Sequence, residues 1–293
     1  MRPNNSELDK LLGVRTPVLD KGFVQLVDYM GGDDAIVQAA RVSYGQGTET
    51  PSKDAALINY LLEHRHTTPF EMCEIKLHVK LPIFVARQWI RHRTANVNEY
   101  SARYSVMHDE FYFPDPEQIQ TQSKSNKQGR DGHLNEDEIR SFQEGLEVIT
   151  GGAWVEYQKA LDNGVTREVA RMLLPINIYT SWYWKIDLHN LMHFLALRCD
   201  PHAQWEIRQY ADLILSIMRL WVPAAAQSFE KHVLGGVRLS SDALNVIRVM
   251  IFNNTRGAFP GGTVDRNIDD LKGAFSKRQW NALMELFDRE LMS

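Results

Sequence analysis

The chain is poor in cysteine and has no long apolar run. Its 293 residues include two cysteines, Cys73 and Cys199, which lie far apart and in no metal-ligand spacing. A disulfide framework is therefore excluded as the basis of the fold, and a reducing cytoplasm is the expected compartment. No stretch approaches the roughly 18 consecutive apolar residues of a membrane-spanning helix. The first residues, Met1 to Ser6, also lack the apolar core of a signal peptide.

An excess of basic residues and a glycine-rich phosphate loop are also missing. The 33 lysines and arginines are outnumbered by 37 acidic residues, which gives a formal net charge of −4. This balance argues against a protein that coats DNA or RNA, because such a protein needs a basic surface. There is no Gly-x-Gly-x-x-Gly or Walker-type motif, so any dinucleotide is bound without a Rossmann fingerprint. The 44% hydrophobic and 24% charged residues are ordinary for a globular protein with a sizeable core.

Hydrophobic periodicity predicts an α+β fold, with a central β-sheet flanked by helices. The clearest strand is Glu74–Leu81, where apolar side chains alternate with lysines and a histidine. The other predicted strands are Gly22–Met30 and Ile178–Ile186. Helices are predicted at Asp33–Arg41, Lys53–His64, Ile83–Arg91, from about Glu136 onward, at Thr166–Leu174, Leu188–Leu197, His202–Trp221 and Ser276–Leu291.

Composition divides the rest of the chain. Gln118–Leu134 consists of Gln, Ser, Lys, Asn, Gly and Asp and has few apolar residues to bury, which predicts a surface loop. After about Leu239 the pattern changes to short helices joined by Gly/Pro-rich turns. We therefore expect a main domain over residues 1–239 and a helical C-terminal extension over residues 240–293.

Arginines concentrate between Arg87 and Arg103, and this is the most informative stretch. Arg87 and Arg91 are four residues apart on one predicted helix face, and Arg93 and Arg103 follow, with Glu99 the only acid. Uncompensated guanidinium groups repel one another, so such a cluster typically binds an anion such as phosphate. A solvated basic face with a few surface ion pairs is the alternative interpretation.

A second polar constellation follows the helix at Leu188–Leu197. Arg198 ends it, and Gln204 and Glu206 open the next helix, so these side chains could form the floor of a polar pocket. The alternative is a surface turn between two helices. Arg167 and Arg171 make another pair four residues apart on one predicted face.

Two further groupings carry weaker signals. His64 and His66 lie at a predicted helix end, but no acid or thiol joins them at ligand spacing, so an exposed helix terminus is favoured over a metal site. Cys199 follows Arg198, which could lower the pKa of its thiol and make it a nucleophile. We favour an inert thiol, because a single Cys near a His is weak evidence.

The arginine stretch contains a motif. Arg91-His92-Arg93, followed by Asn98-Glu99-x-Ser101-x-Arg103, resembles the signature Arg-His-Arg-x-x-Ser-x-Asn-Glu-x-Ser-x-Arg of the flavin-dependent thymidylate synthases, the ThyX family. The segments around His66–Glu71, Pro82–Trp89, Arg167–Arg171 and Leu197–Glu206 support the similarity, which extends over about residues 18–233.

The resemblance implies an activity and its co-substrates. Members of this family methylate dUMP to dTMP with 5,10-methylenetetrahydrofolate as carbon donor and NADPH as reductant, through bound FAD and without a cysteine nucleophile. It further implies a homotetramer whose active sites are shared between subunits, with neither nucleic acid nor membrane as partner and no metal.

The resemblance also implies residue roles. It places Arg198 and Ser101 in the catalytic centre, Arg198 at the uracil and Ser101 in positioning. The residues implied for dUMP are Gln88, Trp89, Ile90, Arg91, Glu99, Tyr100, Ser101, Ala102, Arg103, Arg171 and Arg198. Those implied for FAD are His66, Thr68, Arg91, His92, Arg93, Glu99, Asp187, Leu188, His189 and His193.

The sequence departs from the family pattern in a few places. The first serine of the signature is Asn96 here, and Asp187 and His193 stand where asparagine is common. Two rival functions stay open on the sequence alone. One is a thymidylate synthase that uses Cys199 as nucleophile, and the other is a non-enzymatic nucleotide- or RNA-binding module built on the arginines.

Overall fold

The computed structural model describes residues 5–42, 51–124, 129–247, 272 and 280–281. The chain divides into two compact units, Met1–Gly235 and Gly236–Ser293. In the second unit, residues 241–247 are helical. The helix predicted at Ser276–Leu291 falls almost wholly outside the described residues.

A five-stranded antiparallel sheet forms the centre of the first unit, in the order β1-β2-β3-β5-β4. The strands are β1 (Arg15–Val18), β2 (Gly22–Met30), β3 (Glu74–Pro82), β4 (Asn96–Glu99) and β5 (Tyr179–Asp187). Strands β3 and β5 pair along their whole length, from Glu74 opposite Asp187 to Pro82 opposite Tyr179. The predicted alternation in β3 is confirmed, because Ile75, Leu77, Val79 and Leu81 are buried.

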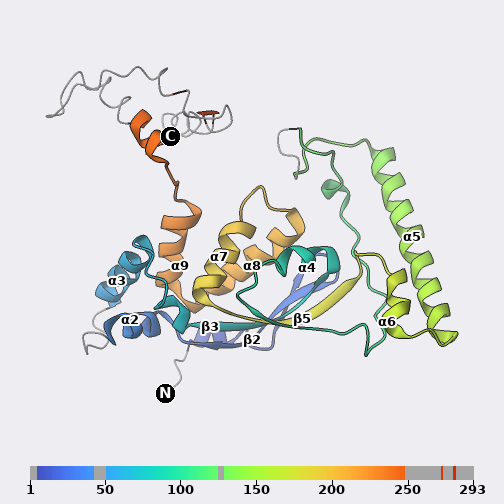
Figure 1. Ribbon diagram of the computed structural model, residues 1–293, viewed down its shortest axis with the longest axis horizontal. Coiled ribbons are helices and arrows are strands. Elements are labelled where there is room, and N and C mark those ends of the chain that lie inside the picture. The colour runs from blue at the N-terminus through green and yellow to red at the C-terminus, as the bar shows by residue number, and fades with distance from the viewer. Residues whose placement is uncertain (1–4, 43–50, 125–128, 248–271, 273–279, 282–293) are drawn as a thin grey trace. The chain divides into compact units, whose positions relative to one another are not determined.

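Helices cover one face of this sheet (Figure 1). Helices α4 (Ile83–Trp89), α7 (Leu188–Arg198) and α8 (Trp205–Trp221) lie over it. Helices α2 (Asp33–Arg41), α3 (Pro51–Glu63) and α9 (Pro223–Phe229) pack together at one end. The remaining elements are α1 (Ser6–Asp9), η2 (Phe70–Met72), η3 (Pro116–Gln118) and η5 (Glu230–Leu234). The predicted α+β class, a central sheet flanked by helices, is confirmed.

The long helix α5 (Glu136–Asp162) lies beyond the other end of the sheet (Figure 1). It begins with a capping box, in which the Asn135 side chain accepts from the Glu138 N–H and the Glu138 carboxylate accepts from the Asn135 N–H. Below it the helix predicted over Thr166–Leu174 is divided into α6 (Arg167–Ala170) and the 3₁₀ turn η4 (Arg171–Leu173). Thr166 occupies the N-cap position, although its hydroxyl makes no capping bond.

The core between sheet and helices is aromatic. The fully buried Trp89 packs edge-to-face on Trp182 and Trp184 and stacks on Phe194, with ring centroids 4.7–5.7 Å apart. Tyr210 of α8 contacts the same indole at 5.9 Å. This cluster fixes α4 on the sheet, and it thereby positions the arginines at and beyond the end of α4.

The sequence analysis did not predict the edge strand at Asn96–Glu99, whose backbone pairs with β5. The described residues of Gln118–Leu134 are irregular and mostly exposed or half-buried, as predicted for a surface loop. Arg130 within it forms an ion pair with the buried Glu206, a contact that composition does not reveal. None of the described helices is long and apolar enough to cross a membrane.

Candidate functional site

A polar cavity of about 1000 Å³ opens where α4 ends and α7 meets α8. We call it the arginine pocket; its lining residues are Arg87, Gln88, Arg91, Arg93, Arg198, His202, Ala203 and Gln204. Four arginines line this space, and no acidic side chain among the described residues does so. Arg87, Arg91 and Arg93 form no ion pair with any other described residue. The arrangement favours the interpretation of the cluster as an anion site over a set of surface ion pairs.

Arg198 is held in this pocket by two hydrogen bonds. Its Nε donates to Nε2 of His92 across 3.1 Å, and its Nη2 donates to the Gln88 carbonyl across 3.3 Å. Partial burial lowers the pKa of Arg198, but a guanidinium remains charged. The side chain is therefore a fixed cation at the wall of the pocket.

His92 lies behind the pocket and is buried, with 8% of its surface exposed. Burial, and then the neighbouring Arg198 and His193, lower the pKa of His92 to about 4. The imidazole is therefore neutral near pH 7, with Nε2 as acceptor and the proton on Nδ1. His92 was predicted to contact the flavin; in this structure it accepts a hydrogen bond from Arg198 behind the wall of the pocket.

A second cavity of about 290 Å³ lies at the start of α4. We call it the loop pocket; its lining residues are Ile83, Glu99, Tyr100, Ser101, Ala102, Met107, Arg171, Leu174, Ile178 and Thr180. Glu99 accepts from the Thr180 hydroxyl across 2.8 Å, and Ser101 Oγ accepts from the Arg103 N–H across 3.3 Å. Arg103 pairs with Glu168 at 3.3 Å on the surface nearby.

The residues predicted for dUMP thus fall into two groups. Gln88, Arg91 and Arg198 line the arginine pocket, whereas Glu99, Ser101 and Arg171 belong to the loop pocket. The two cavities share none of the described lining residues. Within a single chain, the residues predicted for dUMP therefore gather in two separate pockets and do not form one site.

Two other predicted contacts have inaccessible side chains. Trp89 is fully buried in the aromatic core, with none of the residue exposed. Leu188 is fully buried, and its N–H donates to the Cys73 carbonyl across 2.8 Å. Both residues stand next to polar residues in the motif, and sequence adjacency does not report which way a side chain points. Ile90, by contrast, is 40% exposed.

The remaining predicted flavin residues lie near the start of α7 and the end of α3. Asp187 caps α7, because its carboxylate accepts from the Asn190 N–H across 2.9 Å and from the Asn190 side chain across 2.7 Å. His189 is half-buried, and His193 is exposed, with its ring 5.8 Å from that of His92. His66 and Thr68 are exposed in the turn after α3 and line none of the cavities described here.

Neither alternative chemistry raised by the sequence gains support. Burial, followed by the charge of Asp212, raises the pKa of Cys199 to about 12, so the thiol is protonated near pH 7. Among the described residues, no group of three or more His, Cys, Asp or Glu side chains could hold a metal ion. The arginines, not the thiol or the histidines, therefore define the candidate site.

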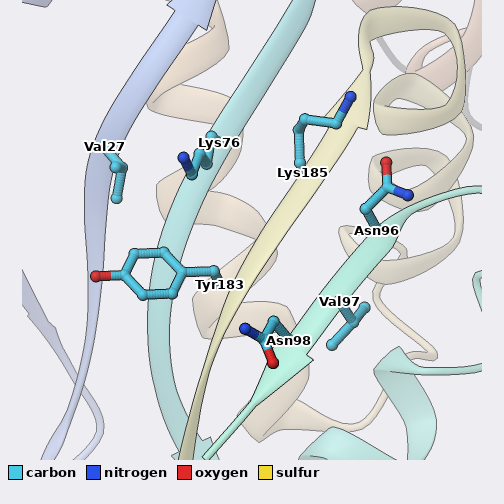
Figure 2. Close-up of a pocket in the computed structure, with 7 residues that line it drawn as sticks. All are labelled: Val27, Lys76, Asn96, Val97, Asn98, Tyr183 and Lys185. Atoms are coloured by element: carbon cyan, nitrogen blue, oxygen red, sulfur yellow. The ribbon is translucent and has the colours of Figure 1, made fainter.

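Sequence reasoning missed a further cavity of about 440 Å³ on the face of the sheet that the three helices leave open (Figure 2). Lys76, Tyr183 and Lys185 rise from β3 and β5, and Asn96 and Asn98 from β4. Asn96, the departure from the signature, therefore faces neither the arginine pocket nor the loop pocket.

The sequence of this chain matches proteins of one known family. Residues 25–224 match the family model described as thymidylate synthase complementing protein. The chain is 50% identical to the flavin-dependent thymidylate synthase of Gluconobacter oxydans, over 98% of this chain and 92% of the relative. It is 51% identical to that of Wolbachia pipientis, over 97% and 96% of the two chains.

A solved structure shares the fold. The UMP/dUMP methylase PolB from Streptomyces cacaoi, bound with 5-Br dUMP, superposes with a TM-score of 0.68 at 31% identity. The match covers 74% of this chain and 98% of PolB. The chain belongs to the family of flavin-dependent thymidylate synthases.

Proposed function

We propose that this chain methylates dUMP to dTMP, with 5,10-methylenetetrahydrofolate as carbon donor and NADPH as reductant through FAD, in the cytoplasm. The observation that carries the proposal is the arginine pocket, which four arginines line and which has no acidic lining residue in the described part of the chain. Such a pocket suits phosphate and an electron-rich pyrimidine, because guanidinium forks bind planar anions and oxygen acceptors.

The described residues also fit FAD. Its pyrophosphate needs cationic donors, and Arg91 and Arg93 lie in the arginine pocket without an ion-pair partner among the described residues. His193, beside His92, adds a ring at the same wall. We assign Arg91, Arg93 and His193 to the cofactor, with His189, His66 and Thr68 as further contacts. Bound FAD supplies the reducing equivalents for the new methyl group.

The protein's own part in the reaction is positioning and electrostatics. Arg198, held by His92 and the Gln88 carbonyl, is a fixed cation that stabilises negative charge as it develops on the uracil. Because this donor is already oriented, it needs no reorganisation when the charge appears. Ser101 holds the turn that carries Arg103 and orients the nucleotide, since the structure places no general base beside its hydroxyl among the described residues.

We further propose that one nucleotide site is completed by two copies of the chain, within a homotetramer. The arginine pocket of one subunit would supply Gln88, Arg91 and Arg198, and the loop pocket of another would supply Glu99, Ser101 and Arg171. The separation of the two pockets in the single chain supports this division.

Exposed apolar side chains on α5, on η4 and just after η4 also favour a second copy. Ile149 of α5 is 63% exposed, Met172 of η4 is 78% exposed and Ile176 is 67% exposed. Helices α5 and α6 pack on η4, so these side chains belong to one part of the molecule. Exposed apolar side chains in one part of the molecule favour an interface there, and the division of the nucleotide site between two pockets favours a further copy of the chain as the partner.

The deciding experiment is an absorption spectrum of the purified protein, followed by anaerobic NADPH with and without dUMP. A flavin band that bleaches faster in the presence of dUMP supports the cofactor and the substrate together. Protein that is colourless, takes up no FAD and leaves NADPH unoxidised would instead favour a non-enzymatic nucleotide- or RNA-binding module.

A further inference from the structure

Glu206 at the start of α8 is a buried carboxylate with three donors. Only 3% of the residue is exposed. Its Oε2 accepts from Arg130 Nη2 across 2.6 Å and from Gln204 Nε2 across 2.9 Å, and its Oε1 accepts from the Tyr112 hydroxyl across 3.3 Å. Burial and the adjacent carboxylate raise the pKa of Tyr112, so this hydroxyl stays protonated and donates. A carboxylate in this position persists only because these donors compensate for its lost hydration.

This carboxylate determines which way the amide of Gln204 points. An ionised carboxylate can only accept, so Gln204 must direct its NH₂ group toward Glu206. The carbonyl Oε1 of Gln204 then faces the other way, and it accepts from Nε2 of Gln88. Gln88 is thereby oriented in turn, and its Oε1 receives no hydrogen bond from a described residue.

The oriented amides end at the wall of the arginine pocket. Gln88 and Gln204 both line it, and the backbone carbonyl of Gln88 accepts from Arg198. Among the cationic side chains of this pocket, an oriented amide oxygen can accept a hydrogen bond from a donor on the ligand. In a pyrimidine nucleotide, that donor is the imide N–H or a sugar hydroxyl.

We propose that Glu206 is a positioning residue for the nucleotide: through Gln204 it orients the Gln88 amide so that its oxygen is presented to the ligand in the arginine pocket. Arg130, from the segment Gln118–Leu134, completes the arrangement by neutralising the carboxylate. The segment thereby contributes to the pocket without lining it. This proposal rests on the proposed use of the arginine pocket for dUMP.

Replacing the carboxylate of Glu206 tests whether it orients the amides of Gln204 and Gln88 or only stabilises the fold. Glu206→Met removes the acceptor, so Gln204 and Gln88 can rotate, and KM and Kd for dUMP should rise about tenfold, the worth of one hydrogen bond. The value of kcat should stay within about twofold, because the lost interaction holds the substrate equally in the ground state and in the transition state. Glu206→Gln retains an oxygen toward Gln204 and can donate to Tyr112, so it should restore dUMP binding to within about twofold of the natural protein.

A double variant makes the test independent of stability. Glu206→Met with Arg130→Met replaces the buried ion pair by apolar groups of similar length, which should return the thermal midpoint toward that of the natural protein. It restores no acceptor for Gln204, so dUMP binding should remain about tenfold weaker. If stability and dUMP binding recovered together, the pair would be a scaffold only and the proposal would be wrong.

Asp54→Asn is the matched control, because Asp54 forms a comparably buried ion pair with Arg41 at 2.7 Å, away from the pocket. This change should lower the thermal midpoint and leave KM for dUMP unchanged. Unaltered dUMP binding in Glu206→Met would overturn the inference, as would weak binding in Glu206→Gln. Failure of the proposed function itself would look different, because the natural protein would then bind no dUMP.

Discussion

The guanidinium of Arg198 donates from its Nε to the Nε2 of His92, a residue 106 positions earlier in the chain. This contact requires an imidazole without a proton on Nε2, and the low pKa of buried His92 meets that requirement. The neutral ring of His92 thus fixes the charged guanidinium of Arg198 at the pocket wall without repelling it. The Arg-His-Arg motif therefore supplies a support for a distant arginine as well as cations of its own.

Arg198→Ala should abolish dTMP formation while FAD remains bound. The change removes the fixed cation from the arginine pocket, and loss of such a donor typically costs about 100-fold or more in rate. The measurement is dTMP formation under saturating substrates, with flavin content determined from the absorption spectrum. Arg219→Ala is the control, because Arg219 pairs with Glu230 on the surface of α8. Normal turnover of dUMP by Arg198→Ala would show that the uracil site has been misassigned.

His92 should make stability fall in mildly acidic solution. Its pKa of about 4 lies below the ordinary value of 6.5, so the unfolded chain binds the proton more readily. The stabilisation is therefore complete above about pH 6.5 and is lost as the pH falls toward 4. Between about pH 6.5 and 5 the free energy of unfolding should drop by on the order of 2 kcal/mol from this group.

His92→Gln provides the comparison for that effect, because Gln offers an acceptor to Arg198 but does not titrate. Denaturant unfolding of both proteins at each pH gives the two slopes. The natural protein should lose more stability than the variant over this window. Parallel slopes would mean that His92 carries no shifted pKa.

The sequence predicted the elements whose pattern is local. The alternation in Glu74–Leu81 and the apolar stripes of α7 and α8 identify the sheet and its covering helices, because burial on one face imposes a period. Strand β4 was missed, since Val97 is its only apolar residue and its hydrogen bonds to β5 join segments far apart in sequence. The ion pair of Arg130 with Glu206 spans 76 residues and has no local signal.

The sequence predicted which residue types form the candidate site better than it predicted which residues share a pocket. Clustered arginines indicate an anion site wherever they meet, and Gln88, Arg91 and Arg198 do meet. Nothing in the order of the motif separates them from Glu99 and Ser101, which occupy another pocket. That separation arises because α4 carries Ile83 at its first turn, in the loop pocket, and Arg87 at its last turn, in the arginine pocket.

Cys199→Ala should retain activity. The thiol has a pKa of about 12, so only a trace of thiolate exists near pH 7 and a nucleophilic role is disfavoured. We expect a rate of dTMP formation within about twofold of the natural protein, because the substitution removes little packing from a partly buried position. Loss of dTMP formation with full flavin content would revive the cysteine-nucleophile mechanism.

Asn96→Ser should be nearly silent. Asn96 is exposed on the edge strand β4 and faces the open side of the sheet, away from both candidate pockets (Figure 2). Surface changes of this kind alter stability by about 0.5 kcal/mol or less. FAD affinity and KM for dUMP should match those of the natural protein. Ser101→Ala, in the loop pocket, is the contrasting variant and should weaken dUMP binding. A large change in FAD affinity for Asn96→Ser would assign a cofactor role to the sheet-face cavity.

Mixing two inactive variants should restore activity if nucleotide sites are shared between copies. Arg198→Ala damages the arginine pocket and Arg171→Ala the loop pocket, so each variant alone should have little activity. When the two chains are coexpressed and assemble at random, about a quarter of the shared sites combine an intact arginine pocket with an intact loop pocket. The mixed assembly, isolated through two different affinity tags, should therefore recover about a quarter of the natural activity. A site built within one chain would contain a damaged residue in every copy, so no recovery on mixing would contradict the shared arrangement.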